Sequence, residues 1–156
     1  MSDDTSRLAL VFRIAARLCA LPLAQVVEIM RPLPVRQLDG TPGFVLGAAM
    51  VRGLPTPVVS GARLLGGEDA PAGGGRWIGV VAGSRRVMLE VDEVGGIRRI
   101  PAGDGAAAQP LLEGVAADRI ATLGRLDGEL LSTLQAARVV PELAWSAIDA
   151  ALGAAA

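Results

Sequence analysis

Short apolar runs bounded by glycine and proline recur along the chain, and they predict a mainly β protein. Runs of this length, with tight turns between them, are typical of the strands of small barrels. The expected strands are Leu8–Ile14, Leu18–Leu23, Gly47–Arg52, Thr56–Val59, Trp77–Ala82, Arg86–Val91, Ala121–Leu126 and Leu130–Leu134. The tripeptide at 126–128, Leu-Asp-Gly, predicts a hairpin turn, because Asp and Gly both tolerate positive φ.

A helical pattern follows at the end of the chain, over 141–153. Pro141 suits the first helical position, and Gly153 suits the C-terminal cap. Apolar side chains recur on one helical face, at Leu143, Ala147, Ile148, Ala151 and Leu152. We expect this helix to pack on its own domain. Residues 61–66 are expected to form a single further turn, and the glycine-rich stretch 66–75 a flexible join.

The two halves of the chain resemble each other. Setting Cys19–Arg31 over Val87–Arg99, at an offset of 68, matches Leu21 with Leu89, Leu23 with Val91, Val26 with Val94, Ile29 with Ile97 and Arg31 with Arg99. Residues 45–49 resemble 112–116 at an offset of 67, and 62–65 resemble 137–140 at an offset of 75, which predicts an insertion near 117–122. In register together, these matches predict two copies of one small motif. Chance likeness between two strand-rich segments is the alternative.

Missing residue types exclude several chemistries. The chain has no His, Lys, Tyr or Asn, which excludes a Ser-His-Asp triad, an imidazole metal site, a P-loop lysine and a Schiff base. Its single cysteine, Cys19, is expected to be a small buried side chain. A net charge of −1 gives no argument for nucleic acid, and no apolar run is long enough to span a membrane. The N-terminus does not read as a signal peptide, so we expect a cytoplasmic protein without a cofactor.

Three acids lie close together near the end of one expected strand. Alternation along the strand sends Glu90 and Asp92 to one face and Glu93 to the other, and no converging third ligand is visible. We interpret them as a solvated strand edge. A small β-barrel enzyme that uses a carboxylate pair is the rival class of function.

Motifs in a fixed order then give the chain a resemblance to a known family. In the first half, a proline-containing strand leads to Val26-Val27-Glu28-Ile29, and Gly47, Arg52-Gly53 and Pro57-Val58-Val59 follow. The second half carries Val91-Asp92-Glu93-Val94. Pro110 and Gly114 match later landmarks of the family. This order and spacing, from Leu8 to about Val140, resembles the CheW family of bacterial chemotaxis adaptors.

The resemblance implies one domain over 1–156, with two small five-stranded SH3-like β-barrels packed together and a C-terminal helix at 141–153. The expected division gives 15–75 to the first barrel, and 76–140 with 8–14 to the second. The resemblance also implies a non-catalytic scaffold. It would join the cytoplasmic tip of methyl-accepting chemoreceptors to the regulatory domain of a CheA-type histidine kinase, without nucleic acid or membrane insertion.

The resemblance also suggests site residues. A receptor-binding groove would include Val26, Glu28, Ile29, Arg52 and Val94, with Glu28 paired to Arg52 beside it. For the three apolar residues taken singly, plain core is the alternative, and for Glu28 an exposed strand edge. Gly47 and Gly53 would shape partner-facing turns by close backbone approach or positive φ, with ordinary turn glycines as the alternative.

The sequence departs from the family pattern at three motifs, and its region between Gly114 and Gly128 is longer than usual for the family. Ser60-Gly61 and Leu134-Gln135 stand where the family usually has Asp-Leu and Leu-Asp, and Met50-Val51 stands for Asn-Leu before Arg52. The first two changes are expected to weaken turn capping, because Asp bonds nearby backbone amides better. They put the partners in doubt, so an adaptor for another two-component pathway, such as pilus or gliding motility, is the alternative function.

Overall fold

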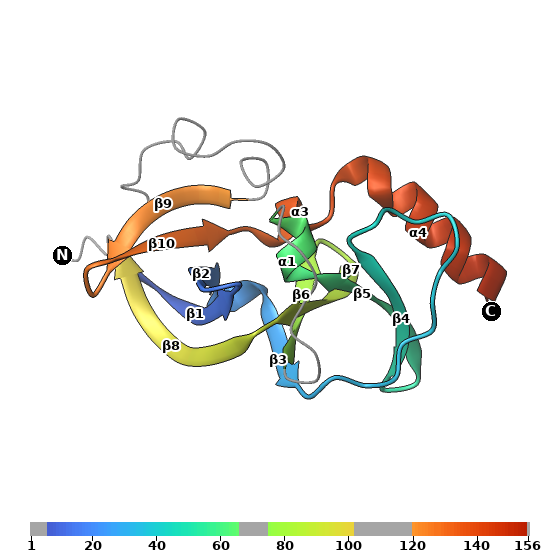
Figure 1. The fold of residues 1–156 in the computed structure, drawn as a ribbon, viewed down its shortest axis with the longest axis horizontal. Coiled ribbons are helices and arrows are strands. Elements are labelled where there is room, and N and C mark those ends of the chain that lie inside the picture. Colours follow the sequence, from blue (N-terminus) through green and yellow to red (C-terminus); the bar gives the residue numbers. More distant parts are fainter. Residues whose placement is uncertain (1–5, 66–74, 102–119, 156) are drawn as a thin grey trace.

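Two five-stranded sheets make up most of the computed structural model, which describes residues 6–65, 75–101 and 120–155. The first sheet has the order β8-β1-β2-β10-β9 and forms barrel A; the second has the order β3-β6-β7-β5-β4 and forms barrel B. The strands are β1 (Ser6–Ile14), β2 (Arg17–Pro22), β3 (Val26–Met30), β4 (Val45–Val51), β5 (Leu54–Ser60), β6 (Arg76–Ala82), β7 (Arg85–Val91), β8 (Glu93–Pro101), β9 (Ile120–Leu126) and β10 (Glu129–Leu134). Figure 1 shows barrel A on the left and barrel B on the right. The predicted fold class, two small SH3-like barrels with a C-terminal helix, is confirmed.

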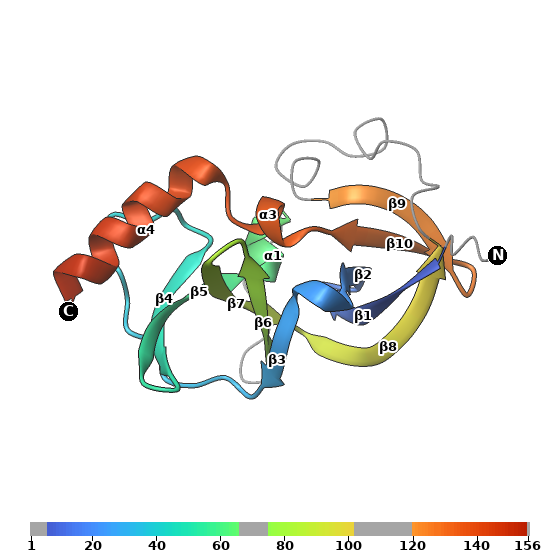
Figure 2. The same cartoon turned by 180° about the vertical axis from the view of Figure 1, so that it is seen from behind.

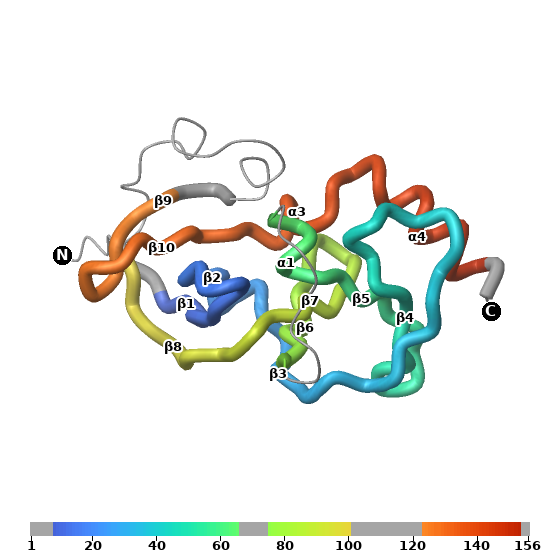
Figure 3. Tube along the Cα trace, viewed as in Figure 1, coloured from blue at the N-terminus to red at the C-terminus, as the bar shows by residue number. Residues whose placement is uncertain are grey.

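Three short helical segments follow strands β2, β5 and β10, and one longer helix ends the described part of the chain. The segments are the 3-10 turn η1 (Leu23–Gln25), α1 (Gly61–Leu64) and α3 (Ala136–Val139); the long helix is α4 (Glu142–Ala155). The predicted turn after residue 60 and the predicted C-terminal helix are both confirmed. Helix α4 lies beside barrel B (Figure 2), and the two chain ends lie at opposite ends of the molecule (Figure 3). Within the described residues, no helix is long and apolar enough to cross a membrane.

All eight predicted strands are present, with ends within two residues of the prediction. Strands β3 and β8 were not predicted as strands. Each contains a register shift, between Val26 and Glu28 in β3 and opposite Val11 and Phe12 in β8, and such a bulge interrupts the alternation of apolar residues. The glycines in β8 obscure the pattern further.

Strand pairing confirms the internal duplication. Ala20 lies opposite Thr133 in barrel A, and Met88 lies opposite Val58 in barrel B. Met88 follows Ala20 by 68 positions and Thr133 follows Val58 by 75, which are the two main offsets found in the sequence. The register shifts repeat as well: Val94–Phe12 and Gly96–Val11 in barrel A correspond to Val26–Val80 and Glu28–Gly79 in barrel B. The two barrels are therefore built on one plan.

Each barrel takes strands from both copies of the motif. Strands β1 and β2 of the first copy join β8, β9 and β10 of the second, while β6 and β7 of the second copy join β3, β4 and β5 of the first. The strand order differs from the predicted division (15–75, and 76–140 with 8–14) in three strands: β2 lies in the sheet of β1, and β6 and β7 lie in the sheet of β3, β4 and β5. Strands β1–β2 and β6–β7 are antiparallel neighbours joined by two-residue turns, and strands joined so tightly pair with each other. The two copies have exchanged these hairpins.

One of the predicted matches between the two copies, that of 45–49 with 112–116, was misplaced. Val45 lies opposite Val59 in barrel B, and this pair recurs in barrel A as Ile120 opposite Leu134, at an offset of 75. The counterpart of 45–49 is therefore the start of β9, and not 112–116. The extra residues of the second copy lie between β8 and β9, mostly in 102–119. That segment falls outside the described residues, with its landmarks Pro110 and Gly114, and so do residues 66–74 of the predicted join 66–75.

A central hydrophobic cluster spans both barrels and reaches α4. Its fully buried members include Leu10, Phe12 and Leu21 of barrel A, Ile78 and Leu89 of barrel B, and Ile148 of α4. Each barrel also has a smaller cluster of its own: Ala9, Val11, Leu18, Ala20, Ile100 and Leu131 in barrel A, and Ala49, Val51, Val58, Trp77 and Met88 in barrel B. Residues of β1 and β6 alternate between the central cluster and the local one, so these strands are buried on both faces.

The capping expected to be weak at Ser60 is intact, which corrects the prediction. The Ser60 hydroxyl accepts a hydrogen bond from the Arg63 amide at 3.2 Å and caps α1. At α3, Gln135 makes no side-chain cap, as expected, but Oε1 of Gln25 accepts from the Ala136 amide at 2.7 Å. Gly61 is required by packing, since a Cβ there would lie 2.7 Å from the backbone carbonyl oxygen of Glu90.

The exchanged hairpins make a direct prediction about folding. Cleaving the chain after Gly67 yields two fragments, and each lacks strands that both barrels need. We expect neither fragment to fold alone, and an equimolar mixture to recover the native circular dichroism spectrum as a 1:1 complex. A fragment that unfolds cooperatively by itself would contradict the exchanged arrangement.

Candidate protein-interaction surface

The predicted ion pair between Glu28 and Arg52 is present. Nη2 of Arg52 donates to Oε1 of Glu28 at 2.7 Å, and Nε donates to Oε2 at 3.4 Å. The Glu28 side chain is 18% exposed and that of Arg52 is 72% exposed. Hydrogen bonding from Arg52 lowers the pKa of Glu28 and raises that of Arg52, which favours the charged form of both groups. The pair joins β3 to the β4–β5 hairpin, at the two edges of the barrel B sheet.

Local backbone geometry explains how the two charges meet. Arg52 and Gly53 have φ of +51° and +81°, as the two-residue hairpin turn between β4 and β5 requires. Glu28 lies opposite Gly79, and a Cβ on Gly79 would lie 3.2 Å from Cγ of Glu28. The missing side chain at Gly79 thus leaves room for the stem of Glu28 to lie over β6, with its carboxylate at the barrel edge.

Ile29 projects from the opposite face of β3. It lies opposite Ile78, which belongs to the central cluster, and cross-strand partners share one face of a sheet. Because β3 is an edge strand, Ile29 remains 45% exposed. The structure therefore separates the predicted groove residues: Ile29 faces the region between the barrels, whereas Glu28 and Arg52 close the edge of barrel B.

Val26 and Val94 occupy equivalent positions at the start of β3 and at β8, as the sequence match predicted. Both are partly buried and pack against the central cluster. Their side chains contribute to the core, and their role in receptor binding stays a prediction.

The matching residue in barrel A was missed by the sequence prediction. Ile97 lies opposite Leu10 of the central cluster and is 55% exposed. It is the repeat counterpart of Ile29, so the alignment at offset 68 already contained the signal. Edge strands β3 and β8 thus each carry one exposed isoleucine, on the sheet face that also contributes to the central cluster. We call Val26, Ile29, Val94 and Ile97 the inter-barrel set.

Barrel A has a comparable ion pair between its hairpin turn and its edge strand, but the strand residue, Arg98, is the counterpart of Met30 and not of Glu28. Nη1 of Arg98 donates to Oδ2 of Asp127 at 3.0 Å, and Nη2 donates to Oδ1 at 3.2 Å. Asp127 is the repeat counterpart of Arg52 and has almost the same φ, +52°. Both barrels therefore tie a hairpin turn to an edge strand, with a base at the turn in barrel B and an acid at the turn in barrel A.

The two predicted site glycines differ in their surroundings. Gly47 has φ of +145°, and a Cβ there would lie 2.2 Å from the carbonyl oxygen of Arg36, whose backbone bridges to Ala48. Gly53 has φ of +81°, and a Cβ at that position would have no atom within 4 Å of it. Close backbone approach holds for Gly47 alone, while Gly53 is an ordinary turn glycine.

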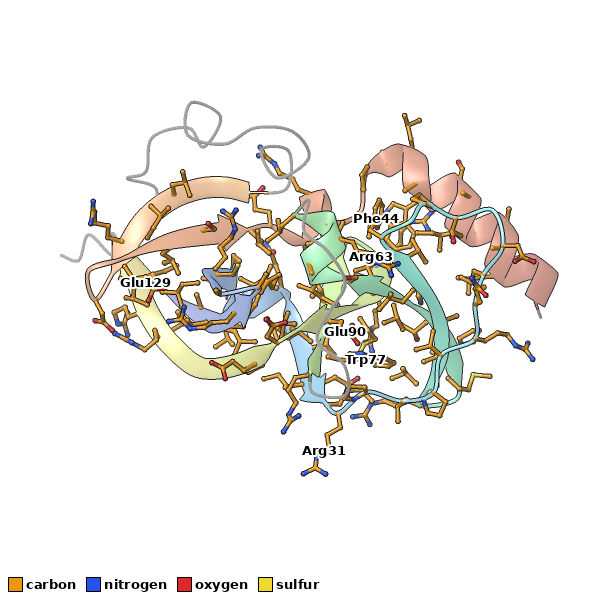
Figure 4. All side chains as sticks on the ribbon, in the orientation of Figure 1. Arg31, Phe44, Arg63, Trp77, Glu90 and Glu129 are labelled. Carbon is orange, nitrogen blue, oxygen red and sulfur yellow. The ribbon has the colours of Figure 1, made fainter. Side chains whose placement is uncertain are left out.

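The acidic cluster does not converge. Glu90 accepts a hydrogen bond from the Trp77 indole at 3.2 Å (Figure 4), and Asp92 accepts from the Ala15 amide at 2.9 Å. Among the described residues, no group of three or more acids or cysteines is placed to hold a metal ion. Burial raises the pKa of Cys19 to about 12, which keeps this thiol protonated. The structure assigns these residues to packing and backbone contacts.

A shallow apolar cavity of about 400 Å³ lies beside strands β4 and β5 of barrel B. Its lining includes Val35, Met50 and Pro55, with Leu152 of α4 on one side. Met50 and Leu54, on either side of the Arg52 turn, are 65% and 64% exposed. Exposed apolar side chains therefore flank the Arg52 turn, which suits contact with a protein partner.

Comparison with known proteins agrees with this architecture. The family model described as a CheW-like domain matches residues 8–144. Among solved structures, the scaffolding protein TtCheW from Thermoanaerobacter tengcongensis is similar, with a TM-score of 0.71 and 20% sequence identity, over 82% of this chain and 88% of that one. No curated protein matches the chain.

The two glycines provide a matched test of backbone packing. Gly47→Ala should destabilise the fold by about 3 kcal/mol, since the new methyl group would collide with the Arg36 carbonyl. Gly53→Ala should lower the free energy of unfolding by only about 1 kcal/mol, because the positive φ is the only obstacle to a side chain there. Urea unfolding measures both; equal losses would show that the close approach at Gly47 has little energetic effect.

The Glu28 ion pair should make stability depend on pH. Because the folded-state pKa of Glu28 lies below its ordinary value of 4.5, the pair stabilises the fold above that pH, and the stabilisation is lost as the pH falls through the lowered pKa. The free energy of unfolding of wild type should exceed that of Glu28→Gln by at most about 1 kcal/mol at pH 7, and this difference should shrink as the pH falls below 4.5. Urea unfolding at several pH values tests this; a difference that grows on acidification would contradict it.

Proposed function

The chain belongs to the CheW-like domain family, and we propose that it couples chemoreceptors to a CheA-type histidine kinase by binding alone. Domains of this family are non-catalytic scaffolds, in agreement with the expectation that the chain is not an enzyme. The coupling role would place the protein in the cytoplasm, with the receptor tip and the kinase regulatory domain as its partners and no cofactor.

The inter-barrel set is the observation that carries this proposal. Two equivalent edge strands present Ile29 and Ile97 on faces turned toward the shared core, and Val26 and Val94 are half-buried behind them. Apolar residues held on rigid strands suit the flank of a helical hairpin, because helices bury an apolar stripe in such sites. The receptor tip is, by the family resemblance, a helical hairpin of this kind.

Arg52 would add selectivity at the margin of this site. Its guanidinium is mostly exposed although it is already bound to Glu28, so its outer N–H groups can still donate to a partner. The pair also fixes the hairpin against β3, which limits the ordering cost on binding. The same arrangement on barrel A carries the opposite charge at the turn, so the two barrels would offer different surfaces to partners.

A related role is favoured by one specific departure from the family pattern. Met50 stands where the family usually has Asn, and it is 65% exposed next to Arg52. An exposed apolar side chain in place of an amide changes what a partner must present there. We therefore keep an adaptor for another two-component pathway, such as pilus or gliding motility, as the second candidate.

Binding measurements with receptor fragments test the coupling role. We would measure the affinity of chemoreceptor cytoplasmic fragments and CheA-type regulatory domains from the same genome. Ile29→Glu and Arg52→Ala should each weaken receptor binding by roughly tenfold or more, since they change the centre and margin of the proposed site. Leu143→Glu, at an exposed apolar position on α4, is the matched control and should leave binding unchanged.

Melting temperatures separate loss of binding from loss of fold. Ile29 and Arg52 are substantially exposed, so both variants should melt close to wild type. The proposal fails if neither partner binds wild type, or if the two variants bind receptor as well as the Leu143→Glu control does. A pathway-specific partner that binds in place of the chemoreceptor would favour the second candidate.

A further inference from the structure

A second cavity, of about 490 Å³, lies on barrel A at the turn between β1 and β2. Its lining is mainly apolar: Ile14, Ala15, Ala16, Leu18, Ala62, Leu65 and Leu130, with Arg17 and Glu129 as the charged residues. It shares no residue with the inter-barrel set. Within the described residues it therefore forms a separate surface.

The repeat relationship identifies what this cavity corresponds to. Ile14 is the counterpart of Ala82, Arg17 of Arg85 and Leu65 of Val140, by the offsets that strand pairing confirms. In barrel B, helix α4 lies at the place of these counterparts, because Arg85 contacts both Trp145 and Asp149 of α4. Ala82 and Val140 pack in the cluster that includes Trp145 and Ile148 of α4.

Arg85 shows how the helix is held on barrel B. Its guanidinium lies 4.4 Å from the centre of the Trp145 ring, and Nη1 donates to Oδ1 of Asp149 at 2.8 Å. An aromatic residue and an acid four positions later therefore lie on one helical face and both meet the same arginine.

On barrel A the corresponding arginine lacks such a partner. Arg17 makes only a long hydrogen bond, 3.5 Å, to the Ser132 hydroxyl, and no described carboxylate lies within ion-pair distance of it. Glu129, also at the cavity, is held by two hydrogen bonds from Arg13. Only ten residues separate Leu65 from Arg76, fewer than the 14 residues of α4, and the described residues contain no counterpart of α4 on barrel A.

We propose that the barrel A cavity binds a helix of another protein, one that carries an aromatic residue four positions before an acid on its apolar face. The apolar lining takes the helix, and Arg17 meets the aromatic ring and the acid as Arg85 does in barrel B. The helix comes from a different protein, because α4 of a second copy is held in its own core by the fully buried Ile148. This inference concerns a separate surface and does not rest on the coupling role.

A labelled peptide of residues 141–155 is the probe, since it has the required pattern. In fluorescence anisotropy with the full chain it should bind saturably, though weakly, because short isolated helices are marginal in water. In the full-length protein, Arg17→Glu and Leu130→Glu should each weaken peptide binding at least about tenfold. The control substitution Leu143→Glu, also made in the protein and not in the peptide, should leave binding unchanged. A peptide with Asp149→Arg should bind wild type more weakly and the Arg17→Glu protein more tightly than the unaltered peptide does.

Three results would overturn the proposal. One is an absence of binding up to about 1 mM peptide, the limit of a useful affinity. Another is equal binding by wild type, Arg17→Glu and Leu130→Glu, which would place the peptide elsewhere, for example in the α4 position of barrel B. The third, measured by light scattering, is a dimer of the protein that Arg17→Glu dissociates, which would assign the cavity to a second copy.

Discussion

Parallel pairing of β2 with β10 and of β5 with β7 is the constraint on which the rest of the structure depends. Parallel neighbours cannot be joined by a tight turn, so each of these pairs must bring together distant parts of the chain. Here each pair joins one copy of the motif to the other. As a result, neither barrel is complete within one copy, and β1 and β6 are buried on both faces. The same pairing leaves β3 and β8 each at one edge of its sheet, in equivalent positions on the two barrels.

Edge strands are the parts of a sheet that must be covered or put to use. In this chain both edges have a bulge, an exposed isoleucine, and an ion pair to a hairpin turn. The backbone features are shared by the two copies, but the charges are not: Glu28 corresponds to Gly96, and Arg52 corresponds to Asp127. A duplicated fold supplies two equal surfaces, and substitutions at its edges make them unequal. That inequality suits a scaffold, which must hold two different partners in a fixed relation.

Much of this could be predicted from sequence, and the failures have physical causes. The strands, the Asp127–Gly128 hairpin, helix α4 and the Glu28–Arg52 pair follow from local patterns or from the family resemblance. The division into barrels could not be obtained from order along the chain, because it depends on long-range parallel pairing. Strands β3 and β8 were missed since bulges break their alternation. Ile97 was missed although its match to Ile29 was visible, because its exposure depends on the position of β8 at a sheet edge.

The repeat also shows how one fold can acquire a second kind of contact. After α3 the chain continues into α4 and fills the recess on barrel B with its own helix; after α1 it returns within ten residues to β6. Within the described residues, no counterpart of α4 covers the recess on barrel A, which keeps its apolar lining and its arginine. Ile14 belongs both to that recess and to the central cluster, which continues toward the half-buried Val26 and Val94. The two surfaces are thus separate in their residues and connected by one rigid core, so that both could be occupied at once without rearrangement of the barrels.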